Sequence, residues 1–371
     1  MIDRRTVSNF NWFFFLAILT VSVIGVVAIY SANHARPEEF FRVLYIKQIY
    51  WILYGLIAML FALVFDYRWF SRYAFLIYTL TLIGLVYVLT NGVVASGSKR
   101  WIYIGPISIQ VSEFAKIAII IVLAKFFESG KISGQYTLRD LIVPAILTAI
   151  LGGLIVVQPD LGTTMMILFI FLAFIVAIEI NRMTLIKLFI FGLASAPALW
   201  FFLKDYQKAR VRTLFNPDLD PLGAGYHSIQ SKIAIGSGGF WGKGLFAGTQ
   251  SRLNFLPEKH TDFIFSVFAE ETGFFGVILL ISLFTFIILK GLNIAFRAAD
   301  RFGFFLSLGL IISIAFYIIF NIGMTVGIFP ITGIPLPFLS YGGSSLITNY
   351  FAVGLLLNVE MRRTLHKIIS K

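Results

Sequence analysis

Residues 12–31 read WFFFLAILTVSVIGVVAIYS, an apolar run of twenty residues that contains no charged side chain. An α-helix rises about 1.5 Å per residue, so about twenty such residues cross the hydrocarbon core of a bilayer. Hydrophobic residues make up 58% of the chain and charged residues only 13%, about half the share that is typical of soluble domains. The run therefore predicts a membrane-spanning helix, and the composition predicts a polytopic membrane protein.

Nine more apolar runs of similar length follow the first. The ten predicted spans cover residues 12–31, 47–65, 73–91, 111–127, 140–157, 162–180, 184–203, 263–290, 303–326 and 345–361. We therefore expect an all-α fold of about ten transmembrane helices. No stretch predicts an attached soluble domain, so we expect a single membrane domain over residues 1–371. Its long polar loop, 204–262, joins the seventh and eighth spans.

The distribution of lysine and arginine predicts the orientation in the membrane. Among the short connections, most of these residues lie at the two chain ends and in the even-numbered loops, for example Arg4, Arg68, Arg297 and Arg362. Cytoplasmic loops carry such an excess of positive charge. Both termini are therefore expected in the cytoplasm, and the long loop is expected on the external side of the membrane.

The composition also excludes several classes of function. The chain has no cysteine, which excludes disulfides and thiol chemistry, and its four histidines do not show the spacing of zinc ligands. The net charge of +12 is explained by membrane anchoring, so no nucleic-acid partner is expected.

Asp262 is the most informative single residue. It ends the long external loop and precedes the apolar run that begins at Phe263. A carboxylate at this junction meets water, the lipid surface and a helix N-terminus, which suits proton transfer on a lipid-linked substrate. The alternative is structural, because Thr261 and Asp262 are both residue types that cap helix N-termini.

Glu113 and Lys116 are ionisable residues in the fourth predicted span, near its external end. Their spacing of three places them on one helix face, where they could simply neutralise each other. Ionisable side chains within a span are nevertheless costly and usually line a cavity or a pathway. We therefore treat both as candidate substrate-binding residues.

Other polar candidates fall on the same external side of the predicted topology. Asp160 lies in the turn before the sixth span, where aspartate is also a common helix cap. Lys99 and Arg100 lie in the third-to-fourth connection, and Ser340 lies in the uncharged stretch 335–345, PLPFLSYGGSS. Irregular backbone of this kind is tolerated at membrane depth only where protein or a cavity covers it. We expect that stretch to form a re-entrant or broken-helix wall beside the site.

The glycine-rich stretch 236–244, GSGGFWGKG, superficially suggests a nucleotide-binding loop. The spacing of glycine, lysine and serine or threonine that a phosphate-binding loop requires is absent, and no strand is evident before it. We expect instead a flexible cationic loop whose backbone amides and lysines approach a phosphate. The preceding stretch 225–235 is expected to be a short amphipathic segment at the membrane interface.

These motifs together resemble the SEDS family (shape, elongation, division and sporulation) over essentially the whole chain. The stretches that carry the resemblance are 99–102 (KRWI), 112–116 (SEFAK), 158–163 (QPDLGT), 220–226 (DPLGAGY), 232–244, 257–265 and 335–345. Stretch 233–239, IAIGSGG, and the short N-terminal segment resemble the RodA branch of the family more than the FtsW branch.

The resemblance implies a peptidoglycan glycosyltransferase acting in cell elongation and rod-shape maintenance. It would polymerise lipid II, an undecaprenyl-pyrophosphate disaccharide-pentapeptide, into β-1,4 glycan strands at the outer face of the membrane. The family implies an essential role for Asp262, with Glu113, Lys116 and Asp160 lining the same cavity. It also implies a divalent cation, Mg²⁺ or Mn²⁺, of unknown ligands. The implied partners are a class B penicillin-binding protein and other membrane proteins of the elongation complex.

In this reaction Asp262 is the expected base for the attacking sugar hydroxyl. We expect external water and loop cations to keep its carboxylate ionised without a greatly raised pKa. Lys116, Arg210 and Lys243 are candidates to stabilise the departing pyrophosphate, and Glu113 would orient Lys116 or help to hold the cation.

Three alternatives stay open at the level of sequence. A lipid II flippase would also carry membrane-embedded charges, although it would place them nearer the bilayer midplane than this clustering towards one leaflet. A division polymerase of the FtsW type shares most of the motifs. A non-catalytic scaffold for a cell-wall synthase is the third, and it leaves the pair of Glu113 and Lys116 unexplained.

Overall fold

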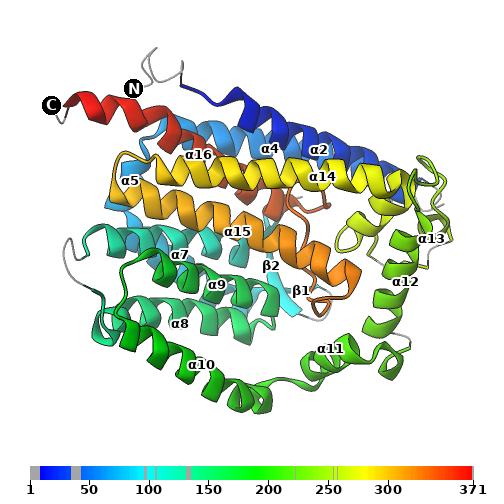
Figure 1. The fold of residues 1–371 in the computed structure, drawn as a ribbon, viewed down its shortest axis with the longest axis horizontal. Helices are drawn as coiled ribbons and strands as arrows, with labels where there is room; N and C mark the ends of the chain where they lie inside the picture. Colours follow the sequence, from blue (N-terminus) through cyan, green and yellow to red (C-terminus); the bar gives the residue numbers. More distant parts are fainter. Residues whose placement is uncertain are drawn as a thin grey trace.

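A computed structural model describes residues 9–34, 43–95, 98–104, 107–130, 135–221, 223–253, 255–256 and 258–369. Its long helices run side by side in one bundle (Figure 1). Helix α2 begins and helix α16 ends at the same end of that bundle, as expected for a chain with an even number of spans.

Within the described residues, six helical segments are long and apolar enough to cross a membrane. They are α2 (Trp12–Asn33), α4 (Leu44–Val64), α6 (Ala74–Asn91), η1 with α8 (Leu138–Val157), α14 (Ile264–Phe296) and α15 (Arg301–Val326). Four further helices lie at the remaining predicted spans, namely α7 (Val111–Glu128), α9 (Leu161–Ala177), α10 (Arg182–Phe202) and α16 (Gly343–Ile369). The structure thus has a helix at each of the ten predicted positions, and a short helix, α5 (Tyr67–Arg72), joins α4 to α6.

Helix α15 forms the centre of the bundle, where it packs against α7, α9 and α14. Gly309 permits this close approach, since an added Cβ would lie 2.6 Å from Ile120 Cγ2 of α7 and 2.9 Å from Phe174 of α9. Small residues at such crossings let helices associate in a bilayer. α15 therefore provides a rigid reference against which the loops at its ends are held.

The connection between α6 and α7 contains a small antiparallel sheet that the all-α prediction missed. Its strands are β1 (Val93–Ala95), β2 (Ser98–Ile104) and β3 (Ile107–Gln110), and Trp101 pairs with Val93 on one side and Gln110 on the other. The segment is rich in valine, isoleucine and aromatic residues, which favour strands. It is too short to stand out in a reading based on membrane spans.

The long loop 204–262 is largely helical. It contains α11 (Asp205–Phe215), η2 (Pro217–Leu219), α12 (Ala224–Ser237) and α13 (Thr249–Arg252). The predicted segment 225–235 lies within α12, and its expected place at the membrane interface stays a prediction.

Helix α14 is interrupted at Gly273, whose φ of 66° and ψ of −164° are non-helical. The stretch 236–244 packs against this break. Lys243 N donates to Glu270 O (3.0 Å), Gly244 N donates to Glu271 O (3.0 Å), and Phe274 N donates to Gly239 O (2.9 Å). These bonds pair backbone groups that a broken helix leaves without intrahelical partners. The glycine-rich stretch therefore completes α14.

Candidate active site

Asp262 lies in a tight turn just before α14, and its backbone N–H donates to Glu258 O (3.1 Å). The alternative that Asp262 caps this helix is wrong, because α14 begins at Ile264 and its N-cap residue is Phe263. Among the described residues, the carboxylate of Asp262 has no hydrogen-bond partner. It is therefore available to a substrate.

The backbone on the N-terminal side of α14 is held from the α15–α16 connection, residues 327–342. Three consecutive carbonyls each accept a hydrogen bond from residues in or beside that connection. The pairs are Tyr341 N to His260 O (2.9 Å), Ser340 Oγ to Thr261 O (2.6 Å) and Asn321 Nδ2 to Asp262 O (3.0 Å). The stretch beginning at Pro335 is non-helical up to the start of α16 and lies beside Asp262, as its sequence predicted.

Ser340 joins the two segments by two hydrogen bonds. Its hydroxyl donates to Thr261 O and accepts from Leu336 N (2.8 Å), and its side chain is buried. The structure therefore gives Ser340 a role in shaping the site, and its predicted contact with substrate stays a prediction.

The electrostatics of Asp262 differ from the sequence-based expectation. Its side chain is half-buried, and the loss of water around it raises the pKa of the carboxyl group to about 7. The nearby charge of Glu258 raises this pKa further, and Arg210 on α11 lowers it. The expectation that this pKa is not greatly raised is wrong, because one cation does not offset burial and a neighbouring carboxylate. A group with a pKa near 7 is well suited to take up a proton at neutral pH.

Glu113 and Lys116 form a buried ion pair, with 2.6 Å between Lys116 Nζ and Glu113 Oε2. Thr348 of α16 donates to Glu113 (3.2 Å), and Lys116 Nζ lies 4.5 Å from the centre of the Tyr317 ring of α15. The two side chains therefore neutralise each other and are both buried in the bundle. The pair joins α7 to α15 and α16.

Asp160 caps α9, accepting from Thr163 N (3.2 Å) and Thr163 Oγ1 (3.0 Å). It also accepts from Ser112 Oγ (3.1 Å) and Gln110 Nε2 (3.2 Å), which tie it to the start of α7. The structural alternative is therefore confirmed for Asp160, and contact with substrate stays a prediction.

The two basic residues of β2 differ. Arg100 Nε donates to Gln158 O (2.9 Å), and Arg100 also bonds to Pro159 O, so it braces the turn before Asp160. The side chain of Lys99 is exposed.

Lys243 lies in a different cluster from Asp262. Its ammonium group pairs with the buried Glu270 (2.7 Å) and donates to Thr249 Oγ1 (2.8 Å). Glu270 also accepts from Thr249 N (2.8 Å) and Gln250 N (3.1 Å), while the neighbouring Glu271 accepts from Ser31. Glu270 therefore fixes the start of α13 and Lys243 to α14, and Glu271 fixes α14 to α2.

The described residues contain no cluster of three or more histidine, aspartate or glutamate side chains that could hold a metal ion. The described side chains therefore do not fit a cation that is held by protein ligands alone.

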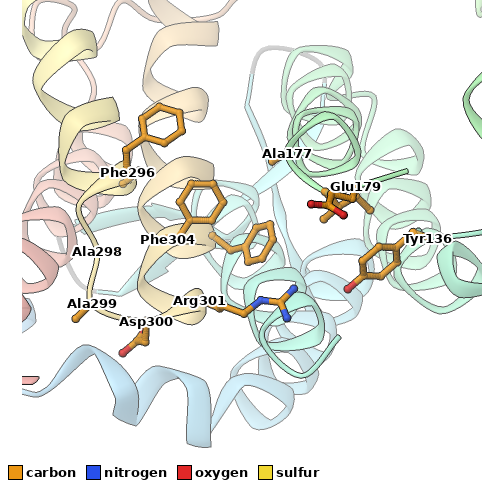
Figure 2. Close-up of a pocket in the computed structure, with 12 residues that line it drawn as sticks. Tyr136, Ala177, Glu179, Phe296, Ala298, Ala299, Asp300, Arg301 and Phe304 are labelled. Atoms are coloured by element: carbon orange, nitrogen blue, oxygen red, sulfur yellow. The ribbon is translucent and has the colours of Figure 1, made fainter. Parts of the chain in front are cut away.

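A cavity of about 690 Å³ lies at the opposite end of α15 from Asn321 and Asp262 (Figure 2). Tyr136, Glu179 and Arg301 line it together with Phe296 and Phe304. It contains none of the predicted site residues.

The structure therefore brings Asp262, Ser340 and Arg210 together. Asp160 is joined to the stretch 335–345 through Gln110. The Gln110 side chain donates to Asp160, and the Gln110 backbone N–H donates to Ser344 Oγ at the start of α16 (3.1 Å).

Two residues of the site are not predicted from the sequence. Asn321 is an amide within the predicted span 303–326, and a polar residue at such a position indicates a buried hydrogen-bonding role. Glu258 carries no such signal, since an acidic residue in a polar loop is ordinary.

Comparison with known proteins supports this picture. The model of the FtsW, RodA and SpoVE cell cycle proteins matches residues 11–365. The chain is 40% identical to the peptidoglycan glycosyltransferase MrdB of Escherichia coli K12 over 96% of this chain and 94% of that protein. It is 34% identical to the peptidoglycan glycosyltransferase RodA of Treponema pallidum (97% and 99%) and 39% identical to stage V sporulation protein E of Bacillus subtilis (92% and 94%).

Solved structures agree. A chain from a study of how a peptidoglycan synthase complex coordinates polymerization and crosslinking superposes with a TM-score of 0.81 at 30% identity, covering 95% of this chain and 98% of that one. The crystal structure of the rod shape determining protein RodA of Thermus thermophilus gives 0.70 at 28% identity, covering 95% and 97%. Sequence and fold agree, and this chain belongs to the FtsW/RodA/SpoVE family of cell cycle proteins, the SEDS family.

Proposed function

We propose that this membrane protein is a peptidoglycan glycosyltransferase that polymerises lipid II at the outer face of the bacterial cytoplasmic membrane during cell elongation. The observation that carries the proposal is the Asp262 carboxylate. This carboxylate has no hydrogen-bond partner among the described residues, and its pKa is about 7. The backbone carbonyl of Asp262 accepts from Asn321 of α15, and the carbonyl of the preceding Thr261 accepts from Ser340 of the α15–α16 connection. Relatives of the chain are named as enzymes of this activity.

In the proposed reaction, the 4-hydroxyl oxygen of one sugar attacks the anomeric carbon of the next. The bond between that carbon and the lipid pyrophosphate breaks, and Asp262 takes the hydroxyl proton. A single in-line displacement inverts the α-linked donor and yields a β-1,4 glycan. General base catalysis of this kind contributes about 10²- to 10⁴-fold in rate.

The departing pyrophosphate needs positive charge. Arg210 is the best-supported candidate, because it is close enough to lower the pKa of Asp262. Lys116, Lys243, Lys99 and Arg100 stay in the proposal as further substrate-binding residues. A divalent cation would arrive with the pyrophosphate, whose oxygens satisfy Mg²⁺ together with one or two carboxylates.

The acyl chain of such a substrate stays in the bilayer, which explains why the enzyme is built from membrane helices. A crosslinking partner of the class B penicillin-binding protein type fits the proposal, since the structural relative was studied in a complex that couples polymerization to crosslinking.

The test is glycan polymerisation from purified lipid II, comparing wild type with Asp262→Asn in liposomes with the penicillin-binding protein and Mg²⁺ or Mn²⁺ present. We expect long glycan from wild type and none from the folded variant. Equal product from both would remove Asp262 as the base. No product from either, with the partner shown to be bound, would favour the flippase alternative, which dye-labelled lipid II crossing the same liposomes would test directly.

A further inference from the structure

Asn321 is a fully buried amide near the end of α15, a helix built almost entirely from apolar and small residues. Its Nδ2 donates to two backbone carbonyls, Asp262 O (3.0 Å) and Ile334 O (2.7 Å). This orientation of the amide is required, because the reverse one would place three oxygen atoms against one another. Burying a polar side chain in a span is costly unless it is used.

The two carbonyls belong to the two segments that meet at the Asp262 carboxylate. Asp262 O belongs to the turn before α14, and Ile334 O belongs to the α15–α16 connection. The residue before Ile334 is Gly333, which has a φ of +74°, and a Cβ built on it would lie only 3.5 Å from Asp262 Oδ2. One amide group thus fixes both the backbone that carries the carboxylate and the backbone that the carboxylate faces.

We propose that Asn321 is a positioning residue that holds Asp262 in the geometry needed for proton transfer. The proposal rests on the function of Asp262 given above. α15 is the most buried of the six helices that are apolar enough to span the membrane. Asn321 therefore links the backbone of Asp262 to the buried centre of the bundle. A misplacement of about 1 Å at a reacting group costs about 100-fold in rate.

The experiment compares Asn321→Leu with Asn358→Leu in the full-length protein bound to its penicillin-binding protein. Leucine is similar in size to asparagine and removes both hydrogen bonds. Asn358 is the matched control. It is equally buried, and its Nδ2 donates to Ala62 O (2.6 Å) and Leu63 O (3.2 Å) on α4 and to Phe65 O, at the opposite end of the bundle from Asp262. Its Oδ1 also accepts from Tyr67 N (3.3 Å) and Arg362 Nε (2.9 Å), so it is a stringent control that loses more hydrogen bonds than Asn321 does.

For Asn321→Leu we expect kcat for lipid II polymerisation to fall about 10- to 100-fold while KM changes by less than about threefold. Hydrogen exchange of the backbone amides around residues 258–263 should become faster in this variant alone. Asn358→Leu loses more hydrogen bonds, so it should lower the thermal midpoint at least as much without either change. If Asn321→Leu does not fold, Asn321→Ser keeps one short donor and should show the same pattern with a smaller loss.

Polymerisation by Asn321→Leu at the wild-type kcat would overturn the proposal, as would an equal loss of kcat in Asn358→Leu. Asp262→Asn separates the two hypotheses. If that variant is inactive and Asn321→Leu is fully active, only the positioning role fails. If Asp262→Asn is active, the proposed catalytic role of Asp262 fails first.

Discussion

Asp262 has a carboxyl group whose pKa is raised to about 7 by burial and by Glu258, against the opposing effect of Arg210. A base acts only when ionised, so activity is lost as the pH falls through the pKa. We expect kcat/KM for lipid II to rise about tenfold per pH unit below pH 7 and to level off above it. The measurement is the pH profile of initial polymerisation rates.

Two substitutions should move this profile in opposite directions. Glu258→Gln removes a negative charge, so the pKa of Asp262 falls and the activity limb shifts to lower pH. Arg210→Gln removes a positive charge and should shift the limb to higher pH. A limb that stays in place in both variants would show that another group controls the rate.

The break in helix α14 should depend on the glycine at position 273. Gly273 adopts a conformation open only to glycine, and an added Cβ would lie 2.2 Å from Gly242 N and 2.8 Å from Phe240 O. Gly273→Ala should therefore destabilise the protein by at least about 1–3 kcal/mol from backbone strain alone. The thermal midpoint of the purified protein measures this loss.

Gly153 provides the control for that substitution. It lies in α8, and nothing lies within 4 Å of a Cβ built on it. Gly153→Ala should be neutral or stabilising by up to about 1 kcal/mol, because alanine favours the helix. Equal midpoints for the two variants would mean that the break at Gly273 is not required.

The same elements show what sequence can and cannot predict. The ten spans could be predicted because bilayer thickness sets a length that every apolar run must meet. The break at Gly273 could not, since in sequence this glycine resembles Gly276 or Gly291 of the same helix until the stretch 236–244 is placed against it. Strand β2 was missed because it is short and lies between two much stronger signals, the apolar runs of the third and fourth spans.

The candidate site was only partly predictable for a related reason. Asp262 and Ser340 stand out as polar residues beside membrane spans, and the structure joins their loops. Their exact partners depend on contacts between segments far apart in the sequence, such as Ser340 with Thr261 and Asn321 with Ile334. The raised pKa of Asp262 likewise depends on packing that no local pattern reveals.

At the scale of the whole molecule, the ion pair of Glu113 and Lys116 joins α7 to α15 and α16 in the interior of the bundle. Removing one partner leaves a buried, uncompensated charge and should cost about 3–5 kcal/mol, whereas replacing both with uncharged residues of similar size is often neutral. We expect Lys116→Met alone to lower the thermal midpoint strongly. The double variant Glu113→Gln with Lys116→Met should recover most of it.

The double variant should nevertheless fail to polymerise lipid II. A neutral pair would stabilise the fold equally well, so we expect that the two charges are present to bind the substrate. Thr348 can still donate to the side-chain amide oxygen that Glu113→Gln introduces in place of the carboxylate, so the link to α16 is retained and loss of activity reports the charges themselves. The glycan assay and the thermal midpoint are measured on the same preparation. Wild-type polymerisation by a stable double variant would make the pair purely structural and would remove Lys116 from the residues proposed to bind the pyrophosphate.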